Sequence, residues 1–303
     1  GKFEENCMEL EDIISKYPPR QIMLVPIAVV ILALISLGVT YVSTGSPVKL
    51  GIEFTGGTLI TVPGIGSEES VAAEFASYPL QDVRDIGNRY MLQFGPMSDL
   101  EYSQLVKLAN DRFESPDIRH MGPIYSKELQ SQVARYLPLS FIFMAMVVFV
   151  VFRQFVVSAL VVLCAMADIL IAAASMNLTG VELSLGTVAA LLMLIGYSVD
   201  TDILLSMRVL KRKGDVDEKI KGAMQTGLTM AGTTIAAVIA LIIISNFLYL
   251  IVPSFTRMDI IADMTMVLIF GLAADVFNTW VTNAQGLRWY LGRPKKLARG
   301  QKR

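Results

Sequence analysis

Long apolar stretches recur along most of the chain, separated by shorter polar ones. A lipid bilayer needs about 20 mostly apolar residues for each helical span. The first such stretch, Ile22–Val42, contains no charged residue. The next, Leu137–Met176, is too long for one span and is interrupted by Arg153-Gln154, which predicts a tight helical hairpin. Three further predicted spans complete a set of six: Leu183–Met207, Ala223–Val252 and Ile260–Gln285.

The basic residues in the segments between the spans predict how the chain is oriented in the membrane. Lys and Arg accumulate in short cytoplasmic loops. The Arg208–Lys221 loop holds six of them and the C-terminal tail holds seven, so we expect both termini in the cytoplasm. The predicted parts are a cytoplasmic segment at 1–21, the first transmembrane helix at 22–42, an extracytoplasmic domain at 43–136, a bundle of five helices at 137–285, and a basic cytoplasmic tail at 286–303.

The long segment between the first two spans has the periodicities of a folded α/β domain. Helices are predicted at Ser67–Ser77 and at Ser98–Phe113. The first has Ser67 as N-cap, with Ser70 in place of the usual Glu, and the second begins with a capping box of Ser98 and Glu101. Strands are predicted at Gly51–Val62, in a hairpin over Val83–Phe94, and at Asp117–Ile124. The order βαββαβ is typical of a small ferredoxin-like sandwich.

Gly56-Gly57 lies in the first predicted strand of this domain. It lacks the spacing and the Lys of a phosphate-binding loop, so we interpret it as a turn or bulge where backbones approach closely. We find no nucleophile–base pair in this segment. The domain is therefore expected to bind rather than to catalyse.

Composition supports an integral membrane protein and excludes several classes of function. Of the 303 residues, 53% are hydrophobic and only 17% are charged, against about a quarter in soluble domains. The net charge of −1 gives no basic field for nucleic acid. Cys7, Cys164 and the single histidine, His120, cannot supply a disulfide framework or a zinc site, so we predict no metal and no cofactor.

Four carboxylates fall inside the predicted spans: Asp168, Asp200, Asp202 and Asp275. Each costs roughly 2.5 kcal/mol or more at the centre of a span, which makes each a candidate functional residue. The spans contain no Lys, Arg or His that could neutralise them, apart from the break at Arg153. Such acids must face water or carry protons, so all four are candidates for proton coupling.

Depth and helical geometry separate these four acids. Asp200 and Asp275 lie at similar depth, whereas Asp200 and Asp202 point about 200° apart and cannot both face one cavity. Asp202 is interpreted as a near-interface acid that extends to water or pairs with Arg208. Asp168 either takes part in coupling or accepts hydrogen bonds from hydroxyls of a neighbouring helix.

A threonine-rich helix face has two open interpretations, interhelical packing and a polar conduit. Its members are Thr226, Thr229, Thr233 and Thr234.

Two motifs give the chain its resemblance to a known family. Gly51–Thr58, which follows one span and opens the α/β domain, resembles the first signature of the SecF family. Gly196–Asp200 resembles the fourth-helix signature of SecD and SecF, and two further blocks lie at Arg153–Asp168 and Gly232–Thr234. The motif residues are Glu53, Phe54, Gly56, Gly57, Gly196, Tyr197 and Ser198.

The resemblance implies a fold and a role. The fold would be a six-helix membrane bundle of the RND superfamily, of archaeal type, in the cell membrane. The role would be that of a non-enzymatic subunit of Sec protein export that partners SecD, acts on preproteins emerging from the SecY channel and uses the proton gradient through Asp200. Glu53 stands where Asp is usual, Thr226 stands where bacterial members carry an Arg, and Asp275 has no obvious bacterial counterpart.

Two other classes of function compete with this interpretation. A free-standing RND-like transporter of small molecules or lipids would act without SecD. An intramembrane aspartyl protease would pair Asp200 with Asp275, but the residues around neither acid match the motifs of that family.

Overall fold

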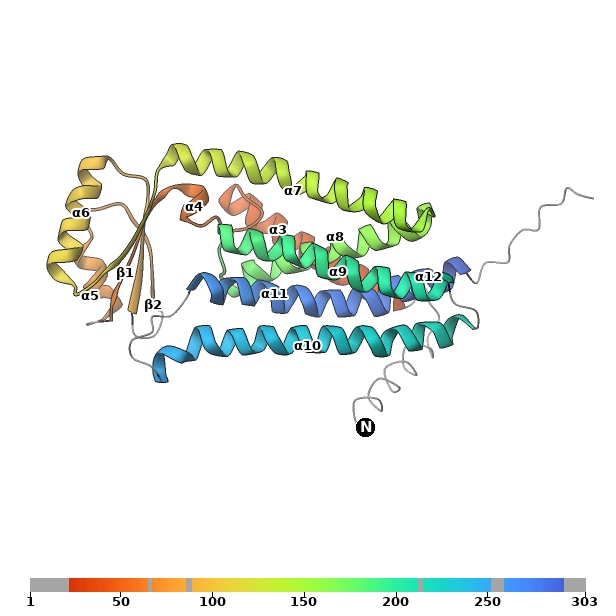
Figure 1. Cartoon of the computed structure of the whole chain (residues 1–303). Helices are drawn as coiled ribbons and strands as arrows, with labels where there is room; N and C mark the ends of the chain where they lie inside the picture. The colour runs from red at the N-terminus through yellow and green to blue at the C-terminus, as the bar shows by residue number, and fades with distance from the viewer. Residues whose placement is uncertain (1–21, 65–66, 86–88, 212–214, 252–258, 292–303) are drawn as a thin grey trace, which may run out of the picture. The chain divides into compact units, whose positions relative to one another are not determined.

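The structure is a computed structural model that describes residues 22–291 except 65–66, 86–88, 212–214 and 252–258 (Figure 1). The predicted N-terminal segment and most of the basic tail lie outside these residues. The chain forms two compact units, one of transmembrane helices and one formed by Leu50–Pro138 with Glu182–Leu185.

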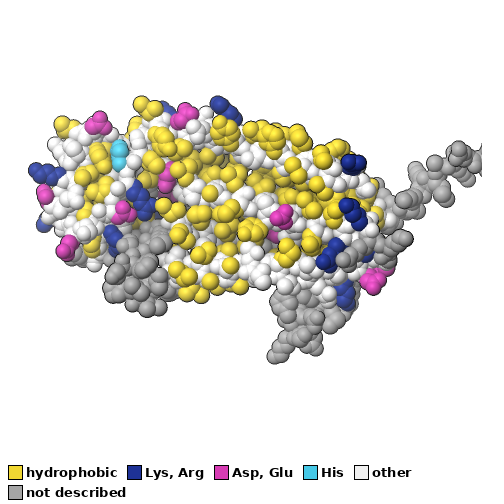
Figure 2. Space-filling model, in the orientation of Figure 1, with side chains coloured by type: hydrophobic (Ala, Val, Ile, Leu, Met, Phe, Trp, Pro, Cys, Tyr) yellow, Lys and Arg dark blue, Asp and Glu magenta, His cyan; other side chains and the backbone are white. Residues whose placement is uncertain are grey.

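Six helices are long and apolar enough to cross a membrane, as the hydrophobic pattern predicts. Hydrophobic side chains cover much of the surface of this helical region (Figure 2), as expected where a helix faces lipid. The helices are α3 (Leu24–Thr44), α7 (Pro123–Phe152), α8 (Phe155–Thr179), α9 (Leu185–Lys211), α10 (Val216–Ile251) and α11 (Asp259–Phe277), the last of which continues through the π-helix η1 (Asn278–Asn283) into α12 (Ala284–Leu291).

The predicted hairpin between the second and third spans forms at Arg153. This residue has a positive φ of 53°, and its N–H donates to the carbonyl of Phe149 at 2.8 Å. Helix α7 begins at Pro123, well before the apolar stretch that starts at Leu137, and it runs through Pro138. Its first turns are polar, so a criterion of apolar length misses them.

The second unit is a four-stranded antiparallel sheet of order β2-β3-β1-β4, which is the predicted ferredoxin-like topology. Helices α5 (Glu68–Glu74) and α6 (Asp99–Arg112) lie on one side of the sheet (Figure 1). Apolar side chains of both helices and of the sheet form one core, with Phe75, Phe94 and Leu105 fully buried. The strands are β1 (Gly57–Pro63), β2 (Leu80–Asp85), β3 (Arg89–Phe94) and β4 (Asp117–Met121).

Both helices of this unit begin with the predicted serine caps. Ser98 and Glu101 form a complete capping box, in which the Glu101 carboxylate accepts from the Ser98 N–H at 2.9 Å and from its hydroxyl at 2.7 Å. Both bonds lower the pKa of Glu101, and the bond from the backbone N–H has the larger effect. Ser67 and Ser70 cap α5 in the same reciprocal way.

The first predicted strand is wrong over its first half. Residues Ile52–Thr55 form a helical turn, α4, and β1 begins only at Gly57. The two glycines make the change of direction, with φ of 75° at Gly56 and 128° at Gly57. A Cβ on Gly57 would lie 2.2 Å from the carbonyl oxygen of Phe94, which confirms the interpretation of close backbone approach.

We expect Gly57→Ala to destabilise the α/β unit by about 1–3 kcal/mol or more, because the residue meets both an unfavourable φ and a backbone clash. Gly122→Ala is the matched control, since a Cβ there has no heavy atom within 4 Å and the φ is not positive. Limited proteolysis of the full chain in detergent measures the difference. Equal protection of the two variants would contradict this role of Gly57.

Candidate functional site in the helical bundle

Three of the four predicted intramembrane acids are buried within the bundle. Asp168 on α8 and Asp202 on α9 have no exposed surface, and Asp275 on α11 is 1% exposed. Among the described residues, no basic side chain forms an ion pair with any of the three. Hydroxyl and amide groups must therefore supply their hydrogen bonds.

Asp168 joins three elements through two short hydrogen bonds. Its Oδ2 accepts from the hydroxyl of Ser198 on α9 at 2.6 Å, and its Oδ1 accepts from the amide of Asn278 on η1 at 2.6 Å. The bond from Ser198 is of the kind expected from the sequence, a hydroxyl of a neighbouring helix.

Asp202 is buried among residues of its own chain, so it neither extends to water nor pairs with Arg208 as interpreted from the sequence. Its Oδ1 accepts from Thr279 Oγ1 at 2.9 Å and from Asn283 Nδ2 at 2.8 Å. Arg208, its expected partner, instead donates to the backbone carbonyl of Gly222. The expected pair was wrong for a geometric reason, since residues six apart on a helix point in different directions, unlike those three or four apart.

Three of these four donors come from a π-helix. Asn278, Thr279 and Asn283 are all buried on η1, where the N–H of Ala284 bonds to the carbonyl of Thr279 in the i→i+5 pattern. Thr279 also lies 3.3 Å from Asp275, one turn earlier on α11. π-helical turns within α-helices occur frequently at functional sites.

Asp200 lies on the opposite side of α9 from Asp202, as the predicted 200° separation requires. It is exposed, and the described residues provide it with no hydrogen bond or ion pair. Tyr197, Leu192 and Met193 on the same side are 41–45% exposed, and Gly196 leaves open space beside them. Asp200 and Asp275 therefore do not form the pair that an aspartyl protease would need.

The threonine-rich face belongs to the surface of α10. Thr229 and Thr233 are exposed, while Thr226 and Thr234 are half-buried. Each hydroxyl donates to a carbonyl of its own helix three or four residues earlier. These threonines do not bond to the buried acids.

The first family motif lies in the other unit and has a structural part there. Phe54 is 2% exposed, and its carbonyl accepts from Gln130 Nε2 at 2.5 Å. The hydroxyl of Ser126 donates to the carbonyl of Ile52 at 3.4 Å. Glu53 is half-buried beside them. The motif thus fastens the first turns of α7 to the α/β unit.

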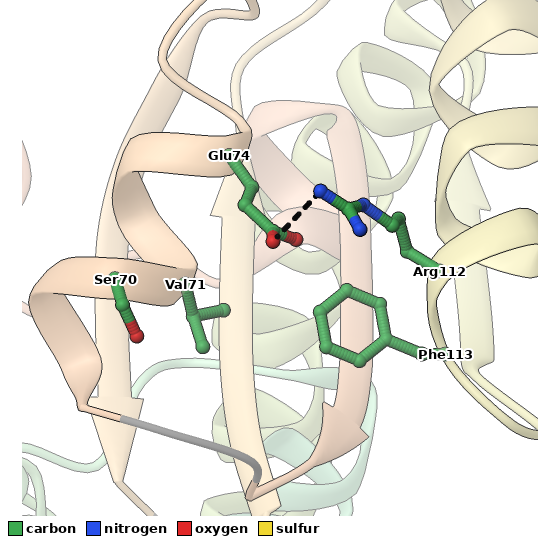
Figure 3. A pocket seen from close by; sticks show the side chains of 5 residues that line it. All are labelled: Ser70, Val71, Glu74, Arg112 and Phe113. Carbon is green, nitrogen blue, oxygen red and sulfur yellow. Dashed lines mark ion pairs between the residues drawn. The ribbon is translucent and has the colours of Figure 1, made fainter.

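A small hollow of about 190 Å³ lies between α5 and the end of α6 (Figure 3). Val71 and Phe113 supply its apolar lining, and Glu74 pairs with Arg112 at 3.4 Å. These charged side chains are 36% and 62% exposed, so the pair contributes at most about 1 kcal/mol. Its lining residues do not form a nucleophile–base pair.

Comparison with known proteins identifies a family. The profile described as protein export membrane protein SecD/SecF, C-terminal, matches residues 101–293, and that of the SecD/SecF GG motif matches residues 41–63. Among curated proteins, the protein-export membrane protein SecF of Methanolacinia petrolearia is 43% identical over 92% of this chain and 96% of its own. That of Haloferax volcanii is 41% identical over 91% and 94%, respectively.

Solved structures show the same fold. The crystal structure of SecDF, a translocon-associated membrane protein from Thermus thermophilus, matches with a TM-score of 0.72 at 19% identity. The match covers 91% of this chain and 38% of the SecDF chain. The chain therefore spans well under half the length of that protein.

We expect Ser198→Ala to lower the stability of the bundle by about 1–2 kcal/mol, because it leaves a buried oxygen of Asp168 without its donor. Thr233→Ala, which removes an exposed hydroxyl bonded only to its own helix, should change stability by less than about 0.5 kcal/mol. Thermal unfolding of both variants in detergent measures this, and equal losses would contradict the importance of the buried bond.

Proposed function

The chain belongs to the SecD/SecF family of protein-export membrane proteins, and from this premise we propose that it is a non-catalytic auxiliary subunit of Sec-dependent protein export. The match to SecF proteins over nearly their whole length supports this role. Its α/β unit lies outside the cytoplasm in this proposal, in agreement with the basic residues of the cytoplasmic loops. There it contacts preproteins that emerge from the SecY channel.

SecD is the proposed partner. The match to the SecD/SecF family model and to the SecDF structure, of whose chain it covers 38%, supports this partner. The exposed face of α9 carries this proposal most directly. A carboxylate facing lipid costs about 2.5–3.5 kcal/mol, and Asp200 has no partner among the described residues. A second membrane protein that covers this face and donates to Asp200 removes that cost.

A photoactivatable cross-linking residue at Tyr197 should capture SecD in intact cells, because this side chain is 45% exposed one turn from Asp200. The same residue at Leu32 of α3, which is 65% exposed on another helix, is the matched control and should capture much less SecD. Mass spectrometry identifies the adducts. Capture of a second copy of this chain at Tyr197, with no SecD, would favour a free-standing RND-like transporter.

The proposal includes coupling of export to the proton gradient. Asp200 is a titratable group on the membrane-embedded surface proposed to meet SecD, so a change in its charge changes that contact.

Asp200→Asn keeps the size of the side chain and removes its charge, and we expect it to lower gradient-stimulated export several-fold. Asp200→Glu keeps the charge and should retain most of the gradient-stimulated export. Export by membrane vesicles with and without a proton gradient provides the measurement. Unchanged gradient stimulation in Asp200→Asn would remove this role.

A further inference from the structure

Two acceptor oxygens in the bundle interior have no hydrogen-bond donor. Oδ2 of Asp202 and Oδ1 of Asn283 are both inaccessible and unpartnered, and both residues have no exposed surface. The other polar atom of each side chain has a partner, since Asn283 Nδ2 donates to Asp202 Oδ1 at 2.8 Å. A buried polar atom without a partner costs about 1–3 kcal/mol, and more when it is charged.

The geometry points to a proton-binding site made by Asp202 and Asn283. A proton on Asp202 Oδ2 turns that oxygen into a donor, and the acceptor in this proposal is Asn283 Oδ1, the orphaned oxygen of the side chain already bonded to Asp202. A carboxylic acid and an amide then form a closed pair with two hydrogen bonds, one in each direction. One proton thus satisfies both orphaned oxygens, and the only bond formed is O–H on the carboxyl group.

Rotating the amide does not replace this proton. If the Oδ1 and Nδ2 atoms of Asn283 exchange places, an amide oxygen lies 2.8 Å from Asp202 Oδ1, and two acceptors face each other. Within the pair itself, either orientation leaves an oxygen without a donor as long as the carboxyl group is ionised.

The surrounding charges favour the same outcome. The titratable groups that act on Asp202 from neighbouring elements are Asp275 on α11, Asp168 on α8 and Cys164 on α8. All are acidic, and the described residues place no cation in an ion pair with any of these carboxylates. A neutral Asp202 avoids both the repulsion and the cost of a buried charge.

Loss of the proton has a mechanical consequence. Without the proton, Asp202 Oδ2 no longer donates to Asn283 Oδ1, so the pair keeps one hydrogen bond in place of two and α9 is held less firmly to η1. The π-helix also carries Asn278, which bonds to Asp168, and Thr279, which bonds to Asp202. Protonation of the Asp202–Asn283 pair therefore affects how α8, α9 and η1 pack against one another.

The role of this site in export rests on the proposed function, but the binding of the proton does not. The pair of Asp202 and Asn283 is a proton-binding site inside this chain, distinct from Asp200 on the opposite side of α9.

Infrared difference spectroscopy of the purified full chain in lipid nanodiscs tests the proton directly. As the buffer is exchanged from neutral to alkaline, the wild type should lose the C=O band of a protonated carboxyl group, and this loss should be absent in Asp202→Asn. Asn283→Leu should shift the band to higher wavenumber at neutral pH, because the acid has lost its acceptor.

Asn278→Leu is the matched control, since it removes an amide of the same π-helix that bonds to Asp168 rather than to Asp202. It should leave the band of Asp202 at its wild-type position. Identical spectra of the wild type and Asp202→Asn would show an ionised Asp202 and overturn the proposal. So would a carboxylate band that responds to added sodium chloride in the wild type but not in Asp202→Asn. Failure of SecD to cross-link would refute the proposed partnership and leave this result unaffected.

Discussion

The helical unit depends on the high cost of placing carboxyl groups in hydrocarbon without a cation. Three acids meet this constraint inside the bundle, where each needs hydrogen bonds from neighbouring helices. Small polar side chains on α9 and η1 supply them, and the resulting bonds also fix how α8, α9 and η1 pack. The polar interior is therefore a source of specific packing that lipid-like side chains alone would not provide.

Helix α9 has two polar faces with different requirements. Asp202 is enclosed by groups of the same chain, whereas Asp200, two residues earlier, is open to the surroundings of the bundle. About half a turn of helix thus separates a group that this chain satisfies alone from a group that is open to another molecule. In the proposed function that molecule is SecD, and the exposed face of α9 is where it binds.

Local signals were sufficient to predict much of this fold. The six spans follow from apolar length, and the serine caps of α5 and α6 follow from spacing of three residues. The burial of Asp202 was also within reach, because Leu194, Ser198, Asp202 and Leu205 recur at helical spacing on the buried face of α9. The π-helix and the pairing of its amides with particular acids depend on tertiary contacts, which no local pattern specifies.

The π-helix also changes the direction in which the later side chains of the last span point. Its wider turn takes in about one residue more than an α-helical turn, so every later side chain is rotated by about 100° from where an unbroken α-helix would place it. Thr279 and Asn283, which both meet Asp202, lie within this turn. A relative with an unbroken helix here would point its later residues in other directions, and an ungapped alignment would equate residues that face different environments.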